Sequence, residues 1–185
     1  QNVHWVDPDW NSTWGLGFSV YQGPGGDTWV SHGGSCPGYR TVIQMNPSEK
    51  RAYVVMINAG GESPGKYARG IHNVLQKYEK EKDVSDSLSV DLEQYRGFYN
   101  AQPWSSELYV TPWKGKLAVL YLPTDNPANA FSLFKHVEGD TFIRIRDNGE
   151  TGETLTFERD ENGNITRFER NGNYKVRLDR EYDQN

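Results

Sequence analysis

The chain has 185 residues, a formal net charge of −5 and an aromatic content of 13% that includes six tryptophans. This aromatic content excludes a disordered chain, and the lack of a basic stretch in either half excludes a nucleic-acid binder. No apolar run reaches the roughly 18 residues of a membrane span. The single cysteine, Cys36, excludes an internal disulfide and a cysteine-based metal site.

The first part of the chain, residues 1–82, is expected to form antiparallel strands followed by a helix. Short turn sequences separate the extended stretches, which favours pairing between neighbours in the chain. An apolar stripe at spacings of three and four residues predicts a helix from Pro64 to Lys82, with Ser63 as its N-cap. The stretches expected to be strands are 14–22, 28–32, 39–45 and 51–57.

The charged, serine-rich stretch 83–90 is interpreted as a linker, and residues 91–185 contain only strand patterns. Short strands with hairpin links predict an eight-stranded antiparallel barrel. The fold class is therefore α+β for the first domain, followed by an all-β barrel domain. The strands expected in the barrel are 95–100, 107–111, 116–121, 130–136, 141–146, 153–159, 165–169 and 174–178.

The glycine-rich stretch HGGSCPGYR, residues 32–40, is compared first with a phosphate loop and with an ordinary turn. A phosphate loop needs a helix directly after its glycines, whereas here Pro37 and a strand pattern follow. No metal or cofactor is expected, because histidines without paired spacing do not suggest a metal site. The four histidines are His4, His32, His72 and His136.

Three stretches together resemble the C-terminal part of the serine β-lactamase and penicillin-binding protein superfamily, in its class C-like form with a His-x-Gly motif. They are WGLGF at 14–18, HGGSCPGYR at 32–40 and YVVMIN at 53–58. The resemblance implies that the backbone N–H of Ser35 donates to an oxyanion, that His32 positions the substrate, and that Gly33 and Gly34 let it approach closely. Cys36 is expected to serve packing.

The nucleophile of that superfamily, a serine three residues before a lysine at a helix start, is not expected in this chain. Ser132 and Lys135 match on a predicted strand, where positions i and i+3 face opposite sides. Ser63 and Lys66 open a helix but follow the His-x-Gly motif instead of preceding it, so Ser63 is interpreted as a helix cap. The family's second motif, Tyr-x-Asn or Ser-x-Asn, is also missing.

This pattern predicts a C-terminal fragment of a serine hydrolase, inactive alone. The resemblance implies that the parent enzyme acts on a small-molecule or peptide substrate, as a D-peptidase, an esterase or a β-lactamase, in the periplasm or outside the cell. The domain boundaries expected are 1–82, 83–90 and 91–185. A sheet edge left exposed would favour homo-oligomers.

The second part resembles the lipocalin-like C-terminal domain attached to some of these hydrolases, on LEQYRGFY at 92–99 and LTFERDENG at 155–163. The alternative for the whole chain is a non-catalytic lipocalin-like binding or oligomerisation module. Five barrel aromatics would line a pocket under that alternative, although filling the core is the favoured interpretation. They are Trp104, Trp113, Tyr121, Phe131 and Phe142.

Overall fold

The computed structural model describes residues 3–6, 13–23, 25–85, 89–100, 103 and 106–180. Contacts within the chain divide it into two units, Gln1–Leu75 and Gln76–Asn185. The division falls inside helix α1 (Pro64–Lys80), so the last turn of α1 belongs to the second unit. Among the described residues, no helix has the length and apolar character needed to cross a membrane.

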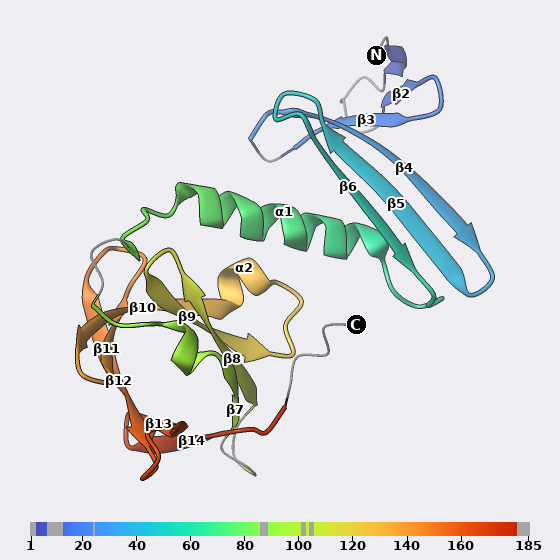
Figure 1. The fold of residues 1–185 in the computed structure, drawn as a ribbon. Helices are drawn as coiled ribbons and strands as arrows, with labels where there is room; N and C mark the ends of the chain where they lie inside the picture. Colours follow the sequence, from blue (N-terminus) through green and yellow to red (C-terminus); the bar gives the residue numbers. More distant parts are fainter. Residues whose placement is uncertain are drawn as a thin grey trace. The chain divides into compact units, whose positions relative to one another are not determined.

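The first unit is built on a six-stranded antiparallel sheet whose strands follow one another in chain order (Figure 1). Antiparallel neighbours need only short turns, which agrees with the turn sequences between them. The strands are β1 (Val3–Val6), β2 (Thr13–Gly15), β3 (Ser19–Gln22), β4 (Thr28–Cys36), β5 (Tyr39–Asn46) and β6 (Arg51–Ile57). The predicted antiparallel strands and terminal helix of this part are confirmed.

Two strand boundaries predicted from the sequence are wrong. The stretch 14–22 forms the two strands β2 and β3, and the Gly15 N–H donates to the Phe18 carbonyl at 2.9 Å in the turn between them. Gly17 has a φ of 79°, a left-handed conformation that favours glycine at this turn. β4 continues past His32 to Cys36, because its glycines adopt the extended form and pair with β5.

Helix α1 covers one face of this sheet. Ala68 is fully buried against Trp29 and Tyr53, since its small side chain lets the helix approach the strands closely. One turn later, the His72 ring meets the Trp29 ring edge-on, with centroids 4.8 Å apart. The Tyr53 hydroxyl and His72 Nδ1 are hydrogen bonded at 3.0 Å, so a polar contact as well as apolar packing holds the helix.

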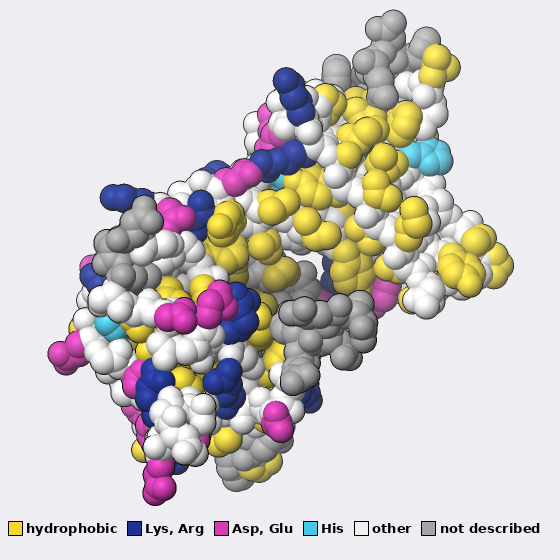
Figure 2. Space-filling model, in the orientation of Figure 1, with side chains coloured by type: hydrophobic (Ala, Val, Ile, Leu, Met, Phe, Trp, Pro, Cys, Tyr) yellow, Lys and Arg dark blue, Asp and Glu magenta, His cyan; other side chains and the backbone are white. Residues whose placement is uncertain are grey.

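On the opposite face of the sheet, apolar side chains of β5 and β6 are exposed. The strand registers place Val54, Met56 and Tyr39 on this face, where they are 58%, 75% and 60% exposed. Figure 2 shows hydrophobic side chains gathered over β4, β5 and β6. Contiguous apolar surface of this kind marks a place where other polypeptide or a ligand binds.

The second unit contains a closed antiparallel barrel of eight strands, as predicted. The ring closes between its last and first strands, where Val176 pairs with Asn100 and Arg177 with Tyr99. A short 3-10 helix, η2 (Glu93–Tyr95), precedes the barrel, and α2 (Pro127–Ala130) lies between two of its strands. The strands are β7 (Gly97–Asn100), β8 (Glu107–Trp113), β9 (Lys116–Leu122), β10 (Phe131–Glu138), β11 (Thr141–Ile145), β12 (Thr151–Arg159), β13 (Ile165–Arg170) and β14 (Asn173–Arg177).

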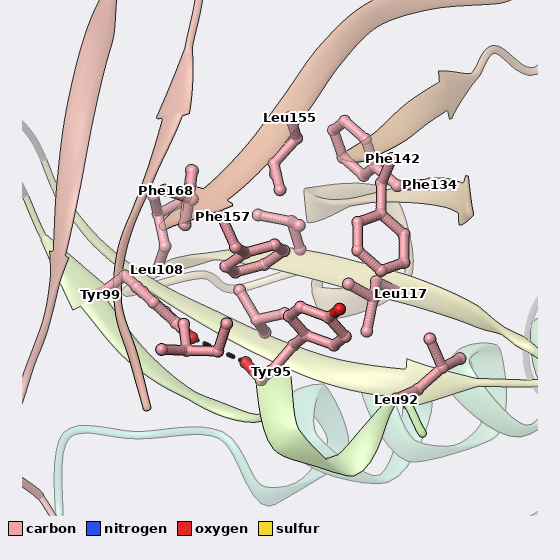
Figure 3. Packing of buried hydrophobic residues seen from close by; sticks show 13 residues of the cluster. Leu92, Tyr95, Tyr99, Leu108, Leu117, Phe134, Phe142, Leu155, Phe157 and Phe168 are labelled. Atoms are coloured by element: carbon pink, nitrogen blue, oxygen red, sulfur yellow. Dashed lines mark hydrogen bonds between the residues drawn. The ribbon is translucent and has the colours of Figure 1, made fainter. Parts of the chain in front are cut away.

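Side chains fill the interior of this barrel (Figure 3). Phe157 meets the rings of Tyr95, Phe168 and Phe142 at centroid distances of 4.6, 5.4 and 5.7 Å. The Tyr99 hydroxyl also lies inside and donates to the Tyr95 carbonyl at 2.8 Å. The interior is therefore a packed core, which is the interpretation that the sequence favoured.

Candidate functional site

The candidate site lies on the distal half of β4, where the predicted residues His32 to Ser35 follow one another. On one side β4 pairs with β5 as far as Cys36 and Tyr39. On its other side β4 pairs with β3 only up to the pair of Ser31 and Ser19. Beyond Ser31, no strand among the described residues covers this edge of β4.

The turn between β2 and β3 is the reason why the edge is open. Phe18 is the last residue of this turn, and its ring contacts the His32 ring edge-on at a centroid distance of 6.1 Å. The chain enters β3 from β2 through a turn at Gly17, so β3 begins only at Ser19 and does not extend along the rest of β4. The pattern WGLGF therefore ends the pairing of β4 just before the His-Gly-Gly motif.

The direction of the backbone groups along this edge follows from the hairpin between β4 and β5. Pro37 and Gly38 form its two-residue turn, and Gly38 has a φ of 83°, as a type II turn requires. Such a turn makes its closing pair, Cys36 and Tyr39, a hydrogen-bonded pair, and the pattern alternates from there. The N–H of Ser35 is thus expected to point away from β5, toward the open edge.

An observed contact supports this alternation. Ser31 is separated from Ser35 by an even number of positions, so its polar groups face the same side of the strand. The Ser19 hydroxyl on β3 donates to the Ser31 carbonyl at 2.9 Å, which places that carbonyl on the β3 side. The Ser35 N–H therefore faces the side on which the described residues place no strand beside the end of β4.

The two glycines are needed for different reasons. A Cβ at position 34 would lie 2.7 Å from the Thr41 Oγ1, so part of the requirement for glycine comes from the neighbouring strand. A Cβ at position 33 would meet only the Thr41 carbonyl at 3.6 Å, an ordinary contact. The neighbouring strand therefore does not require glycine at position 33, and the lack of a side chain there would instead leave room for a molecule that approaches the open edge.

The exposure of two predicted residues matters for their roles. His32 is exposed on the same strand face as Gly34, as a residue that contacts substrate would be. Cys36 is also exposed, so the packing role expected for it is wrong. Its position at the end of a hairpin, where few residues surround it, explains the difference.

Sequence reasoning missed Arg40, which lies directly opposite Ser35 on β5. Paired residues of an antiparallel sheet have side chains on the same face, so a cation lies beside the candidate site. Arg40 Nη1 donates to the Glu62 carbonyl at 3.3 Å, a contact that anchors the guanidinium near the start of α1. The two-residue turn at Pro37 and Gly38 was the signal that fixes this pairing.

The structure places the two Ser-x-x-Lys matches at the start of α1 and on a barrel strand. Lys66 Nζ lies 3.7 Å from Glu62 Oε2, and the Lys66 N–H donates to the Ser63 carbonyl at 3.1 Å in the first turn of α1. Ser132 and Lys135 both lie on β10, opposite Val119 and Ile143 of the neighbouring strands. In the described part of the chain, no group of three or more His, Cys, Asp or Glu side chains is placed to hold a metal ion.

A comparison with known proteins finds one family model that matches the first unit. Residues 2–76 match the protein-family model described as Beta-lactamase, which covers the whole sheet and most of α1. The first unit is β-lactamase-like. The resemblance inferred from the three sequence stretches is thereby confirmed for this unit, and no curated protein matches the chain.

Solved structures similar to the chain as a whole are more distant than this family match. A crystal structure of SurE is 21% identical to this chain, with a TM-score of 0.38. The match covers 90% of this chain and 37% of the SurE chain. An octameric penicillin-binding protein homologue from Pyrococcus abyssi is 17% identical with a TM-score of 0.37, at 95% and 40% coverage. The chain thus spans about two fifths of the length of these structures.

The barrel was the second candidate site, and the four predicted aromatic residues that the structure describes there fill the core or lie outside it. Phe142 belongs to the buried cluster, whereas Trp113 and Phe131 pack on each other outside it, with ring centroids 4.8 Å apart. Tyr121 is 42% exposed and accepts a hydrogen bond from Arg170 at 3.0 Å. Trp104 lies outside the described residues.

Tyr95, Asp140 and Arg159 form one hydrogen-bonded network in the second unit. The Tyr95 hydroxyl donates to Asp140 Oδ1 at 2.7 Å, and Arg159 Nε donates to Asp140 Oδ2 at 2.8 Å. Burial, together with the bond to Asp140, raises the pKa of Tyr95 to about 12. The hydrogen bond from Arg159 holds the pKa of Asp140 below its usual value. Because each group already has its partner, this network serves the structure of the barrel.

Proposed function

We propose that this chain is the C-terminal part of a serine hydrolase of the β-lactamase and penicillin-binding protein superfamily, which transfers acyl groups from amide or ester substrates. The observation that carries the proposal is the open edge of β4 in a β-lactamase-like unit, with the Ser35 N–H directed toward it. The nucleophilic serine and its lysine would come from polypeptide outside these 185 residues.

The exposed apolar surface of the first unit supports the proposal that further polypeptide of the enzyme completes the site. Besides the open sheet face, helix α1 carries Tyr67, Ile71 and Leu75 at a spacing of four residues, each between 39% and 49% exposed. A stripe of this kind normally packs against another element. Further polypeptide of the same enzyme would cover these surfaces and complete the site.

In the proposed reaction, the serine hydroxyl attacks the substrate carbonyl, the C–N or C–O bond breaks, and the amine or alcohol leaves with the hydroxyl proton. Water then hydrolyses the acyl-enzyme to the acid and the free serine. The Ser35 N–H would donate to the oxyanion, and a donor of this kind is worth about 3 kcal/mol in the transition state. Exposed His32 and Arg40, whose side chains lie on opposite faces of the sheet, would contact the substrate from the two sides of the open edge, and Arg40 would favour a substrate that carries a carboxylate. A D-peptide or a β-lactam meets that requirement, and so does an acidic ester.

The barrel is proposed to be a lipocalin-like domain that supports the hydrolase instead of carrying a ligand. The filled interior is the observation behind this assignment, because thirteen buried side chains occupy the space where a ligand would bind. The alternative of a non-catalytic module therefore remains only in its oligomerisation form, with association through an exposed sheet edge. A periplasmic or extracellular location is part of the same proposal.

The first test is acyl labelling followed by intact mass measurement. The 185-residue chain, incubated with a labelled penicillin or a fluorophosphonate, is expected to gain no mass, whereas the longer polypeptide encoded by its gene gains one acyl group. An adduct on Ser63 of the short chain would overturn the proposal.

The second test separates the Ser35 backbone from its side chain in the longer polypeptide. Ser35→Pro removes the N–H that faces the open edge and leaves the pairing with β5, so the acylation rate should fall about a hundredfold. Ser35→Ala keeps the N–H and should change the rate by less than about threefold. Equal rates for the two variants would show that this N–H is not the oxyanion donor.

A further inference from the structure

The two ends of the barrel in the second unit are built differently. One end is covered by η2, whose Tyr95 is fully buried and whose Gln94 Oε1 accepts a hydrogen bond from Arg159 Nη2 at 2.6 Å. At the opposite end β9, β11 and β13 finish, and β10, β12 and β14 begin. Four of these strands carry a charged side chain at this end that faces the inside of the barrel.

Strand alternation gives these side chains their direction. Side chains two positions apart on a strand face the same side, and three charged residues lie two positions from a residue of the buried core. These are Arg144 after Phe142, Glu153 before Leu155 and Arg170 after Phe168. Lys175 pairs directly with Phe168, so it faces inward as well. It is half-buried, whereas its neighbours Tyr174 and Val176 are exposed.

Direct contacts bring these side chains together next to the core. Arg144 Nη1 donates to Glu153 Oε1 at 3.0 Å, and Arg170 Nη2 donates to the same oxygen. Arg170 Nη1 donates to the Tyr121 hydroxyl at 3.0 Å. The Arg170 Cζ lies 5.3 Å from the ring centroid of Phe134, which is fully buried. The charged groups therefore lie against the outermost rings of the packed interior.

Positive charge exceeds negative charge in this group of side chains. We call Tyr121, Arg144, Glu153, Arg170 and Lys175 the cationic end of the barrel, and its three cations and one carboxylate leave an excess of two positive charges. The Arg170 and Glu153 side chains are only 13% and 18% exposed. Burial lowers the pKa of Lys175, and the Arg170 charge lowers it further. The cations thus lie close together with little water, where a bound anion would relieve their repulsion.

A donor at the cationic end is left over. Arg144 Nε is buried and makes no hydrogen bond within the part of the chain that the structure describes. A buried N–H without an acceptor is rare in folded proteins, because it has lost its bonds to water without replacement. The Arg144 side chain as a whole is 36% exposed, so a ligand at this end can reach it. An oxygen atom of that ligand would supply the acceptor.

We propose that the cationic end binds the phosphate group of a small phosphate monoester. The excess of two positive charges matches this group, which is mostly a dianion at pH 7 because its second pKa is about 6. Guanidinium groups form charge-assisted hydrogen bonds with phosphate oxygens, and Arg144 and Arg170 provide two guanidinium groups. The Tyr121 hydroxyl accepts from Arg170 and can donate its own proton to the phosphate.

The packed interior is compatible with this site. Buried rings fill the barrel and exclude an apolar ligand there, but the phosphate would lie at the end of the strands and needs no space between the rings. The rest of the molecule would remain outside the barrel. The proposal concerns the second unit alone, so it does not depend on the hydrolase assignment.

Isothermal titration calorimetry of the 185-residue chain at fixed ionic strength tests the proposal, with glycerol phosphate, inorganic phosphate and acetate as probes. Glycerol phosphate should bind at one site with a Kd of about 0.1 to 1 mM. Acetate, with a single charge, should bind at least about tenfold more weakly. Binding of inorganic phosphate without binding of glycerol phosphate would overturn the assignment to a monoester. Equal binding of acetate, or no measurable binding of either phosphate, would overturn the site itself.

Lys175→Met and Lys135→Met form a matched pair of variants. Lys135 is exposed on β10 and follows Phe134, whose side chain faces the core, so Lys135 lies on the outside of the barrel. Lys175→Met removes a cation from the cationic end and should raise the Kd for glycerol phosphate at least about tenfold. Lys135→Met removes the same charge from the outside and should change the Kd less than about twofold. Burial already disfavours the charge of Lys175, so methionine is expected to fit there.

Glu153→Gln tests the sign of the effect. It removes the carboxylate of the cationic end and raises the excess to three positive charges, so the Kd should fall at least about threefold. Equal effects of the two lysine variants, or weaker binding by the folded Glu153→Gln chain, would overturn the proposal. If Glu153→Gln does not fold, the lysine pair decides alone. Acyl labelling of the longer polypeptide is unaffected by these outcomes, so the two proposals fail separately.

Discussion

Replacing Phe157 with alanine tests whether the barrel interior is a packed core or a ligand cavity. Phe157 is 3% exposed and lies at the centre of the ring cluster, in contact with Tyr95, Tyr99, Phe142 and Phe168 (Figure 3). The substitution removes a whole ring from a site whose neighbours belong to different strands. Because those strands are held in a closed barrel, they are not free to collapse into the gap.

The expected loss of stability follows from two contributions. Burying a phenylalanine side chain is worth about 1.5–3 kcal/mol, and the cavity left behind adds to the loss. Together they predict that the free energy of unfolding falls by about 4 kcal/mol. With a urea dependence of about 2 kcal/mol per M, the unfolding midpoint of the second unit should move down by about 2 M.

Urea unfolding followed by circular dichroism provides the measurement, with Tyr174→Ala as the control. Tyr174 is 47% exposed on β14 and has the Arg167 guanidinium 4.1 Å from its ring centroid, so its loss should cost less than about 1 kcal/mol. Benzene should bind to the Phe157→Ala variant and restore part of its stability. A cost below about 1 kcal/mol, or stoichiometric binding of an apolar dye by the unmodified barrel, would refute the packed-core argument.

Three further predictions concern the barrel. Burial raises the pKa of Glu153, but its backbone hydrogen bond and those from Arg170 and Arg144 outweigh this effect and lower the pKa to about 2. Glu153 therefore stabilises the fold above its ordinary pKa of 4.5, and this contribution should disappear as the pH falls from about 4.5 to 2. Glu153→Gln should flatten that part of the stability profile, and an unchanged profile would contradict the assignment. Gly115→Ala should cost about 2–3 kcal/mol in urea unfolding, because φ is 77° and the new Cβ would lie 2.5 Å from the Ser85 N. Gly149→Ala, with a φ of 82° and open space, should cost only about 1 kcal/mol, so equal costs would exclude the clash. Tyr95→Phe should cost about 1 kcal/mol through the lost bond to Asp140, and no measurable cost would show that the bond is not formed in solution.

Most of the strands and their order could be predicted from the sequence, because the signals are local. Turn sequences such as Pro37–Gly38 and Asn171–Gly172 indicate where hairpins lie. An alternating pattern of apolar and polar residues between two turns then indicates a strand. The helix from Pro64 was predicted for the same reason, since its stripe repeats within one segment. The family resemblance also rested on short contiguous stretches.

Tertiary structure decided where the site is open and what surrounds it. The turn that divides 14–22 into two strands ends the pairing of β4 at Ser31, and that ending depends on which residues of separate strands lie opposite each other. Arg40 lies opposite Ser35 only because of the register between β4 and β5. Closure of the barrel between β14 and β7 joins residues far apart in the chain.

The physical reason is the range of the interactions. A turn or a helix stripe is fixed by neighbours a few residues apart, so the amino-acid sequence alone determined the hairpins, the helix and the candidate motif. Hydrogen bonds between strands and the filling of the barrel join distant segments, whose order and register a local pattern does not specify. The end of the β3–β4 pairing at Ser31 and the particular rings that meet around Phe157 were therefore decided only by the folded structure.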